Sequence, residues 1–195
     1  SFDINKPGIK PAQLVGGVLG GTVRQGKFAE GQEIEISPGY MVEEKNKKVW
    51  KPLRTTITKI FSGGQPVPEI LPGGSMALGT LLDPTVVKSD SLTGALVSVP
   101  GKLPSLRYQL TLDTHLLPRV VGAKEELEVK PLAKNEVLML NVYSAATVGV
   151  VVDPSKKNTT CALKKPVCCN VGDRITISRK GGDRFRLIGY GILKG

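Results

Sequence analysis

Short segments of alternating polar and apolar residues, with turn residues roughly every 8–12 positions, most constrain the fold of this chain. The alternation is clearest over residues 106–113. Its apolar members are expected to face a core and its polar members to face water; the apolar members are Leu106, Tyr108, Leu110 and Leu112. Almost no segment has the period of an amphipathic helix. The pattern predicts an all-β protein built as barrels or sandwiches.

Other strands are predicted where β-branched runs end at Gly or Pro. Residues 32–37 alternate and are expected to stop at the following Pro-Gly pair. Residues 55–61 are expected to stop at the following Gly-Gly pair. Residues 174–179 and 185–188 flank a Gly-Gly-Asp turn, which is typical of a hairpin.

Two further strands are almost continuously apolar, at residues 137–143 and 148–152. Strands that are buried on both faces have this composition, because neither side chain direction points to water. We therefore expect both faces of these strands to be covered.

Residues 99–104 predict a domain boundary, because two prolines and a glycine separate two strand-rich halves. The predicted domains are 1–101 and 102–195. The 195 residues are 40% hydrophobic, which is enough to form a core in each half.

The charge is basic, with a formal net charge of +10. Residues 1–101 hold 11 basic and 9 acidic residues, whereas residues 102–195 hold 16 basic and 8 acidic residues. A positive field favours an anionic partner, nucleic acid first. The second domain is expected to carry most of this field.

No catalytic residue and no metal site are predicted, and an enzyme is not expected. Cys161, Cys168 and Cys169 lack the spacing of a zinc site or a disulfide framework, so we expect reduced cysteines half-buried in strands. His115 is the only histidine, and no nucleophile elbow accompanies it.

No long apolar run or signal peptide is found in the sequence. A membrane-spanning helix needs about 18 apolar residues, which no run approaches. The chain opens without Met on what reads as mid-protein sequence. The expectation is a cytoplasmic protein without a membrane partner, present here as an excised fragment.

Two segments imitate nucleotide-binding motifs. Residues 21–27 have the spacing of a phosphate-binding loop, but Phe28 stands where a Ser or Thr would bind Mg²⁺. A turn into a strand is predicted there instead of a helix. Residues 5–8 resemble a guanine-reading motif, but Gly8 replaces its carboxylate. Neither segment predicts a nucleotide site.

One long run carries a resemblance to a known family. Residues 20–36, which read GGTVRQGKFAEGQEIEI, resemble the second domain of translational GTPases, as do residues 72–79 and 94–101. Four other segments look like the gamma subunit of eukaryotic and archaeal translation initiation factor two, namely residues 1–8, 79–85, 132–141 and 186–191.

The resemblance implies two consecutive β-barrels, the second and third domains of such a subunit, without its GTPase domain. GTP and Mg²⁺ would then belong to the missing domain, and no cofactor is expected in this chain. In the family, the full subunit carries initiator methionyl-tRNA to the small ribosomal subunit. It forms a heterotrimer in which the alpha subunit docks on the first barrel and the beta subunit on the GTPase domain.

The resemblance also suggests two RNA-binding surfaces. One wall of a pocket for the tRNA acceptor end is predicted from glycine-rich segments whose backbone can approach RNA closely; its residues are Gly20, Gly21, Thr22, Gly73, Gly74, Ser75 and Met76. A phosphate-facing patch is predicted on the second barrel; its residues are Lys156, Lys157, Lys164, Lys165, Arg174, Arg179, Lys180, Arg184 and Arg186.

Three alternatives stay open for these residues. The chain would fit an elongation-factor-like carrier of aminoacyl-tRNA, or a protein-assembly module without direct RNA contact. A hydrolytic β-barrel around His115 is the third reading. Independently of these functions, the glycines can be turn and corner residues only, and the basic side chains solvated strand faces.

Overall fold

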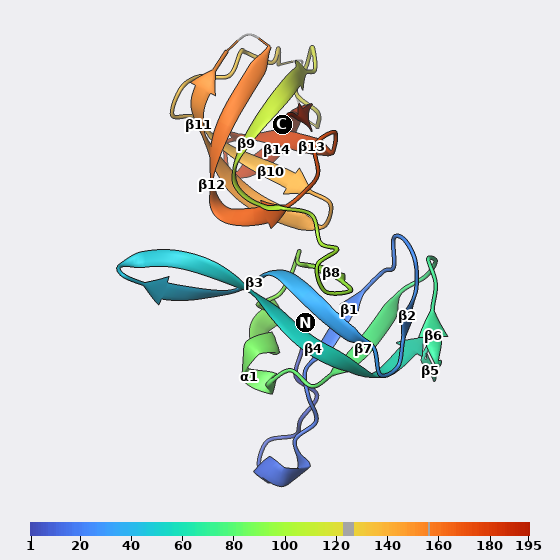
Figure 1. Cartoon of the computed structure of the whole chain (residues 1–195). Helices are drawn as coiled ribbons and strands as arrows, with labels where there is room; N and C mark the ends of the chain where they lie inside the picture. The colour runs from blue at the N-terminus through green and yellow to red at the C-terminus, as the bar shows by residue number, and fades with distance from the viewer. Residues whose placement is uncertain (123–126, 156) are drawn as a thin grey trace. The chain divides into compact units, whose positions relative to one another are not determined.

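The computed structural model describes residues 1–122, 127–155 and 157–195. It divides into two compact units, Ser1–Leu103 and Pro104–Gly195. Antiparallel strands are the main regular structure of both, so the predicted all-β class is confirmed (Figure 1). The second unit closes into a barrel, whereas the sheet of the first curls without closing over its described residues.

The sheet of the first unit has the strand order β1-β7-β4-β3-β8, with β5 paired to β4 and a separate β2-β6 pair. The bounds are β1 Val18–Gly21, β2 Phe28–Ala29, β3 Glu33–Glu44, β4 Lys47–Ser62, β5 Gln65–Pro66, β6 Glu69–Ile70, β7 Met76–Thr80 and β8 Leu96–Ser98. Helical turns are short: η1 Pro11–Gln13, α1 Pro84–Val87 and η2 Lys88–Asp90. The predicted turn into a strand after residue 27 is confirmed in residues 30–33, where a turn leads into β3, but the short strand β2 comes before it.

The core of the first unit lies on the concave side of this sheet. Ile34 and Ile36 of β3 point inward with the two-residue period of a strand, whereas a register shift of β4 against β7 after Ile57 turns both Ile57 and Ile60 inward. The fully buried side chains are Ile34, Ile36, Ile57, Ile60, Leu78 and Val87. Val87 comes from α1, which Asp83 caps by accepting a hydrogen bond from the Thr85 amide at 2.8 Å.

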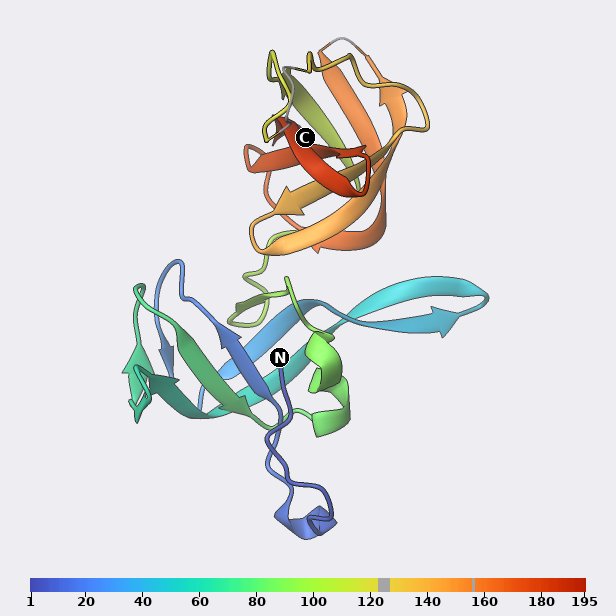
Figure 2. The same cartoon turned by 180° about the vertical axis from the view of Figure 1, so that it is seen from behind.

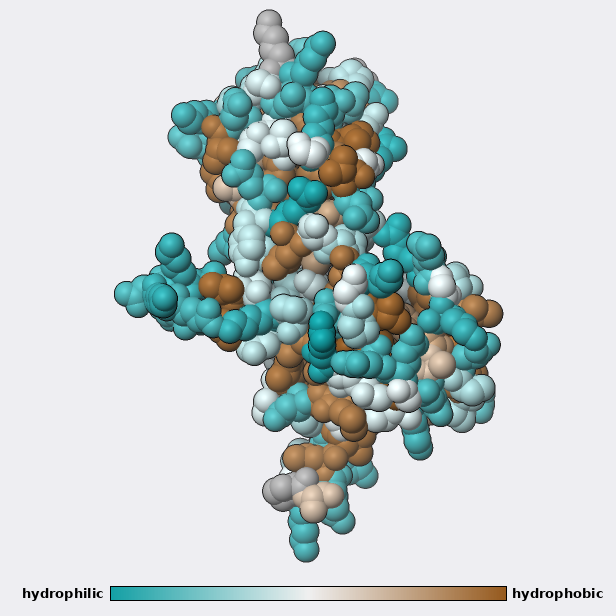
Figure 3. All heavy atoms as spheres, viewed as in Figure 1, coloured by the Kyte–Doolittle hydropathy of each residue, from teal (hydrophilic) through white to brown (hydrophobic). Residues whose placement is uncertain are grey.

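The prediction that the strand beginning at residue 32 stops at Pro38-Gly39 is wrong. Strand β3 continues to Glu44, because a shift in its register with β4 after Ile36 absorbs the Pro-Gly pair. Gly39 has φ +75°, and a Cβ atom there would lie 1.9 Å from the Lys51 carbonyl oxygen. The extended β3–β4 hairpin projects from the first unit (Figure 2), and its surface is mostly hydrophilic (Figure 3). The predicted stop at the Gly-Gly pair after β4 is confirmed.

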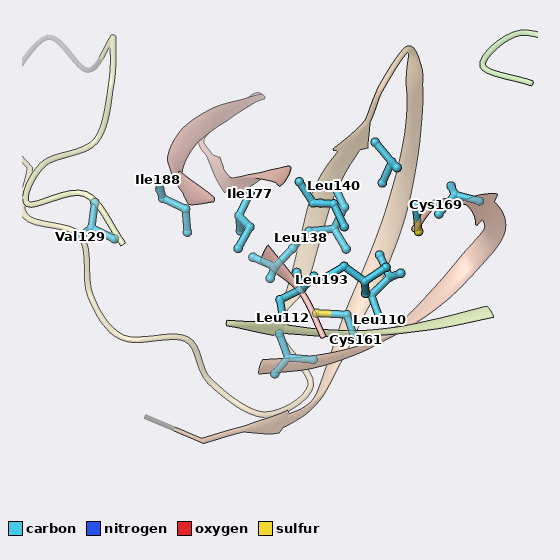
Figure 4. Packing of buried hydrophobic residues seen from close by; sticks show 14 residues of the cluster. Leu110, Leu112, Val129, Leu138, Leu140, Cys161, Cys169, Ile177, Ile188 and Leu193 are labelled. Atoms are coloured by element: carbon cyan, nitrogen blue, oxygen red, sulfur yellow. The ribbon is translucent and has the colours of Figure 1, made fainter. Parts of the chain in front are cut away.

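The second unit is a closed barrel in the order β10-β11-β12-β9-β14-β13. The bounds are β9 Leu106–Leu116, β10 Val137–Val142, β11 Ala145–Pro154, β12 Asn158–Cys168, β13 Arg174–Gly181 and β14 Arg184–Leu193. The predicted hairpin is confirmed, since β13 and β14 pair from Arg174↔Ile192 to Gly181↔Arg184. Inward Leu, Ile and Val side chains fill the barrel (Figure 4).

Two expectations about these strands are wrong. Strands β10 and β11 are covered on one face only: Leu138 and Leu140 are fully buried, but Val137 is 49% and Val150 36% exposed. Tyr108 is also exposed rather than inward, although Leu110 and Leu112 are buried as predicted. The pairing of β9 with β12 shifts between Ala162 and Val167, so the alternation of β9 is not continuous at its start.

The three cysteines are free thiols and fully inside the second unit, more deeply buried than predicted. Cys161 lies in the barrel core beside Leu110, its partner in strand pairing. Burial raises the pKa of Cys161 to about 11 and that of Cys169 to about 11, because the thiolate form loses its hydration there.

Close contact between β14 and β9 yields a first prediction. A Cβ atom on Gly189 would lie 2.4 Å from the His115 carbonyl oxygen and 3.0 Å from Leu116 Cα. Gly189→Ala is therefore expected to lower the free energy of unfolding of the second unit by about 1–3 kcal/mol. A urea titration followed by amide NMR signals of the second unit measures it. In the control Gly181→Ala the nearest atom would be Arg186 Cδ at 3.7 Å, and a shift as large as that of Gly189→Ala would contradict the prediction.

Buried thiols yield a second prediction. The ordinary thiol pKa is 9.0 and the folded values are about 11, so the unfolded chain loses these protons at lower pH than the folded chain. The contribution of the neutral thiols is fully present below pH 9 and lost as the pH rises towards about 11. We expect the stability of the double variant Cys161→Ala, Cys169→Ala to fall less steeply over this range. Equal slopes for variant and wild type in urea titrations would count against the thiols.

Candidate nucleic-acid interface

The two glycine-rich segments of the predicted pocket wall lie side by side. Gly20 and Gly21 end β1, and Met76 begins β7 directly after the Gly73–Ser75 turn. The strands pair with Gly20 opposite Ala77 and Gly21 opposite Met76. The fold thus brings together residues that are more than fifty positions apart in the chain.

This edge of the sheet is open. Met76 is half-buried against the core of the first unit, and all the other residues of the predicted pocket wall are exposed. A Cβ atom on Gly21, Gly73 or Gly74 would meet nothing within 4 Å. The Gly73–Ser75 turn is tied to the end of β4, because the Ser62 hydroxyl donates to the Ser75 carbonyl oxygen at 3.4 Å. A chain of RNA can therefore approach the backbone here without displacing side chains.

An aromatic residue that the sequence did not single out borders this edge. Phe2 is 45% exposed and forms a β-bridge with Val18. Its Cε1 atom lies 3.7 Å from the position of a Cβ on Gly20. Phe2 stands in a segment without strand periodicity, so no local signal in the sequence points to this contact.

The basic residues predicted as one phosphate patch fall into separate places on the second unit. Lys156 lies outside the described residues. Lys157 precedes β12 and Lys164 and Lys165 lie within it, with Lys157 and Lys164 exposed and Lys165 half-buried. Lys180 and Arg184 are exposed at the tip of the β13–β14 hairpin.

Arg179 holds the segment that connects β9 with β10. Its Nη1 donates to the Lys130 carbonyl oxygen at 2.9 Å and its Nη2 to the Pro131 carbonyl oxygen at 3.1 Å. Both Nε and Nη2 also donate to the Glu136 carboxylate, the latter at 3.2 Å. Because the ion pair is largely shielded from water, with side chains 23% and 18% exposed, these bonds hold residues 130–136 in place ahead of β10.

Arg186 has a related position. It is the cross-strand partner of Arg179, and its Nη1 donates to the Gly122 carbonyl oxygen. The backbone of Val121 also donates to the Leu187 carbonyl oxygen at 3.1 Å. The guanidinium groups of Arg179 and Arg186 therefore donate hydrogen bonds to backbone carbonyl oxygens of their own unit.

Arg174 lies at the other end of β13 and has a different environment. Its guanidinium carbon is 3.6 Å from the centroid of the Tyr190 ring. The Tyr190 ring stacks in turn on His115, with centroids 4.9 Å apart and an interplanar angle of 19°. His115 Nε2 lies 3.8 Å from Asp113 Oδ1. The position of Arg174 over the Tyr190 ring is typical of a cation–π contact, and the Arg174 side chain is exposed to solvent.

The lysine of the segment that imitates a phosphate loop is already paired. Lys27 Nζ donates to Glu69 Oε2 at 2.8 Å, across the β2-β6 pair. The hydrogen bond to Glu69 raises the pKa of Lys27. Among the residues that the structure describes, no group of three His, Cys, Asp or Glu side chains is placed to hold a metal ion.

Comparison with known proteins identifies the family. Residues 108–193 match the family model described as "Initiation factor eIF2 gamma, C terminal". The chain is also 50% identical over 194 residues to "Translation initiation factor 2 subunit gamma" of Methanothermobacter thermautotrophicus, which covers 100% of this chain and 48% of that protein. The chain belongs to the initiation factor 2 gamma family. The predicted resemblance is confirmed.

Other gamma subunits agree with this assignment. The chain is 50% identical over 195 residues to the protein of Methanocaldococcus jannaschii and 50% identical over 194 residues to that of Thermococcus kodakarensis. Each alignment covers 100% of this chain and 47% of the relative. This gamma-family chain thus spans about half the length of the curated relatives it matches.

A solved structure shares the fold. The "Crystal structure of bacterial selenocysteine-specific elongation factor EF-Sec" matches with a TM-score of 0.64 and 21% identity. The match covers 91% of the gamma-family chain and 25% of the elongation factor chain. At this identity the likeness concerns the fold alone.

Helices of membrane-spanning length and apolarity are absent from the described part of the gamma-family chain.

The bonds of Arg179 yield a third prediction. Arg179→Lys removes the planar fork that reaches two carbonyl groups and Glu136 at once, so the second unit is expected to lose about 1–3 kcal/mol of stability. The matched control is Lys180→Ala, next in the chain and exposed, with a shift of about 0.5 kcal/mol or less. Urea titrations compare the two. Equal stabilities of Arg179→Lys and wild type would show that the hydrogen bonds of Arg179 do not contribute to the stability of the second unit.

Proposed function

We propose that this chain is the RNA- and subunit-binding part of a translation initiation factor gamma subunit. The full-length protein binds initiator methionyl-tRNA together with GTP and delivers it to the small ribosomal subunit. The observation that carries this proposal is the 50% identity to initiation factor gamma subunits over 100% of the chain. GTP and Mg²⁺ belong to the half of the relatives' length that this chain does not span.

In this proposal, the edge formed by Gly20–Thr22 and Gly73–Met76 is one wall of the pocket for the tRNA acceptor end. Its support is the pairing of Gly21 with Met76 and the open space above both glycine segments. Backbone amide groups at such an edge can donate to phosphate or ribose oxygens. The half-buried Met76 offers a polarisable apolar contact to the end of the acceptor arm.

The same proposal assigns docking of the alpha subunit to the first unit and of the beta subunit to the missing GTPase domain. The projecting β3–β4 hairpin supports an interaction role for the first unit. It carries exposed Tyr40 and Met41, which are 42% and 45% exposed, and Met41 pairs with Trp50. Aromatic and methionine side chains are enriched in the centres of protein interfaces.

The basic residues of the second unit form the remaining part of the proposal, as contacts to tRNA or ribosomal RNA. Their support is the excess of basic residues over residues 102–195. The separate places of Arg174, Arg179 and Arg184 argue for several phosphate contacts along a path and against a single compact patch.

An elongation-factor-like carrier is the competing function. It is favoured by the fold shared with a selenocysteine-specific elongation factor, but that match has 21% identity against 50% for initiation factors. The two functions differ in the tRNA bound. A full-length gamma subunit, assembled with alpha and beta subunits and GTP, is expected to bind initiator methionyl-tRNA more tightly than elongator methionyl-tRNA. Equal affinities would favour the elongation-factor alternative.

A fourth prediction concerns the pocket wall. Gly21 has no neighbour within 4 Å of a Cβ position and an ordinary φ, so Gly21→Trp fits the fold and covers the edge. In the full-length factor with GTP, this variant is expected to bind initiator methionyl-tRNA at least about 10-fold more weakly, because the indole occupies the space that the acceptor end needs. Filter binding measures the affinity.

Two glycine variants control for the turn. Gly74→Trp places the same bulk in the pocket turn, and Gly8→Trp places it in the N-terminal loop; both glycines have positive φ and open space around them. Both substitutions therefore carry comparable backbone strain. Gly74→Trp is expected to weaken tRNA binding and Gly8→Trp to leave it unchanged. Unchanged affinity in folded Gly21→Trp and Gly74→Trp factors would remove this edge from the site.

A further inference from the structure

Arg174 differs from Arg179 and Arg186 of the β13–β14 hairpin in its contacts, and from exposed Arg184 in resting on an aromatic ring. Arg179 and Arg186 donate to carbonyl oxygens of the segment between β9 and β10. Arg174 is exposed and its guanidinium lies over the face of Tyr190, 3.6 Å from the ring centroid, without a hydrogen bond or ion pair to the described residues. Its N–H groups are therefore available to an acceptor from outside the chain.

The guanidinium is held in one orientation by neighbouring strands. Tyr190 is the cross-strand partner of both Thr176 and His115, so side chains of β13, β14 and β9 meet on the outer face of the barrel. Buried Ile175 and Gly191 alternate with outward Arg174 and Tyr190. Stacking of Tyr190 on His115, with centroids 4.9 Å apart, fixes the plane over which Arg174 lies.

Charges around this stack favour an anion. Lys157 is exposed next to β9, where its carbonyl oxygen accepts from the Thr114 amide at 3.0 Å. Lys194 is exposed and its amide donates to the Thr111 carbonyl oxygen at 2.9 Å.

Two carboxylates lie close to the stack. Asp113 lies beside His115, at 3.8 Å. Asp173, which precedes Arg174, accepts hydrogen bonds from the Tyr143 hydroxyl and, at 2.7 Å, from the Asn170 amide. Asp173 is therefore engaged, and Asp113 faces the histidine end of the stack.

We propose that Arg174 binds a backbone phosphate of RNA, and that Tyr190 and His115 are positioning residues that hold its guanidinium for this contact. The inference rests on the proposed function, which supplies RNA as the partner. A guanidinium with a fixed plane presents two parallel N–H groups to two phosphate oxygens. Lys157 and Lys194 extend the positive surface along β9. Several positive charges in a row match the repeated phosphates of RNA, whereas a single carboxylate would need only one of them.

The test uses the 195-residue chain and fluorescently labelled initiator tRNA over a series of salt concentrations. Arg174→Ala is expected to weaken binding about 10-fold and to lower the slope of log affinity against log salt by about one unit. Lys134→Ala is the matched control. It removes one exposed positive charge before β10, whereas Arg174 lies near the far end of that strand, by the pairing of Asn141 with Thr176.

Variants of the stack separate positioning from folding. Tyr190→Leu is expected to weaken binding about 3-fold through the lost cation–π contact, and Tyr190→Phe is expected to restore the wild-type affinity, since it keeps the ring. His115→Ala is expected to lower affinity in the same direction as Tyr190→Leu. Circular dichroism confirms that each variant is folded, and a Tyr190→Phe chain as weak as Tyr190→Leu would overturn the positioning role.

Several outcomes would overturn the inference and leave the proposed function intact. One is equal affinity and salt slope for Arg174→Ala and Lys134→Ala. Another is a wild-type chain that binds no tRNA while the full-length factor does. A third is an Arg174-dependent complex with a polyglutamate peptide and unchanged tRNA binding, which would assign the stack to an acidic protein. Loss of initiator tRNA binding by the full-length wild-type factor would instead overturn the proposed function.

Discussion

The close approach of β14 to β9 is the constraint on which the second unit depends. A Cβ atom on Gly189 would lie 2.4 Å from the His115 carbonyl oxygen, and one on Gly191 would lie 2.7 Å from Leu112 Cβ. Without side chains at these positions the strands pair, and the ring of strands closes around its apolar core. The same pairing sets Tyr190 opposite His115 on the outer face. The β14–β9 register thus serves both closure of the core and the Tyr190–His115 stack, and the β13–β14 register adds Arg174 to that stack.

Positive charge in the second unit has two kinds of surroundings. Arg179 sits at the edge of the barrel, where its donors meet carbonyl oxygens and Glu136, because a partly buried cation is stable only with such partners. Arg174 lies on the solvated outer face and rests on an aromatic ring. Net charge alone does not distinguish these two arginines, although one stabilises the unit and the other is available to a partner.

Local patterns in the sequence located strands β3, β4, β9, β10 and β11 and the β13–β14 hairpin, because alternation and turn residues act over a few positions, but they did not single out β12. The family followed from the resemblance of longer segments. The errors arose where distant residues intervene. Strand β3 continues past Pro38-Gly39 through a shift in its pairing with β4. Strands β10 and β11 are apolar on both faces but covered on one. The cysteines lie deeper than the strand pattern indicated, because their neighbours come from other strands.

The sequence by itself determined that the fold is all-β, where several of the strands lie, and which family the chain belongs to. Only the tertiary structure decided that Gly21 lies opposite Met76 and that Arg174, Tyr190 and His115 form one stack. The physical reason is that alternation is a property of neighbouring residues, whereas cross-strand contacts depend on the register of each pair. That register follows from packing the whole core, to which residues throughout the unit contribute.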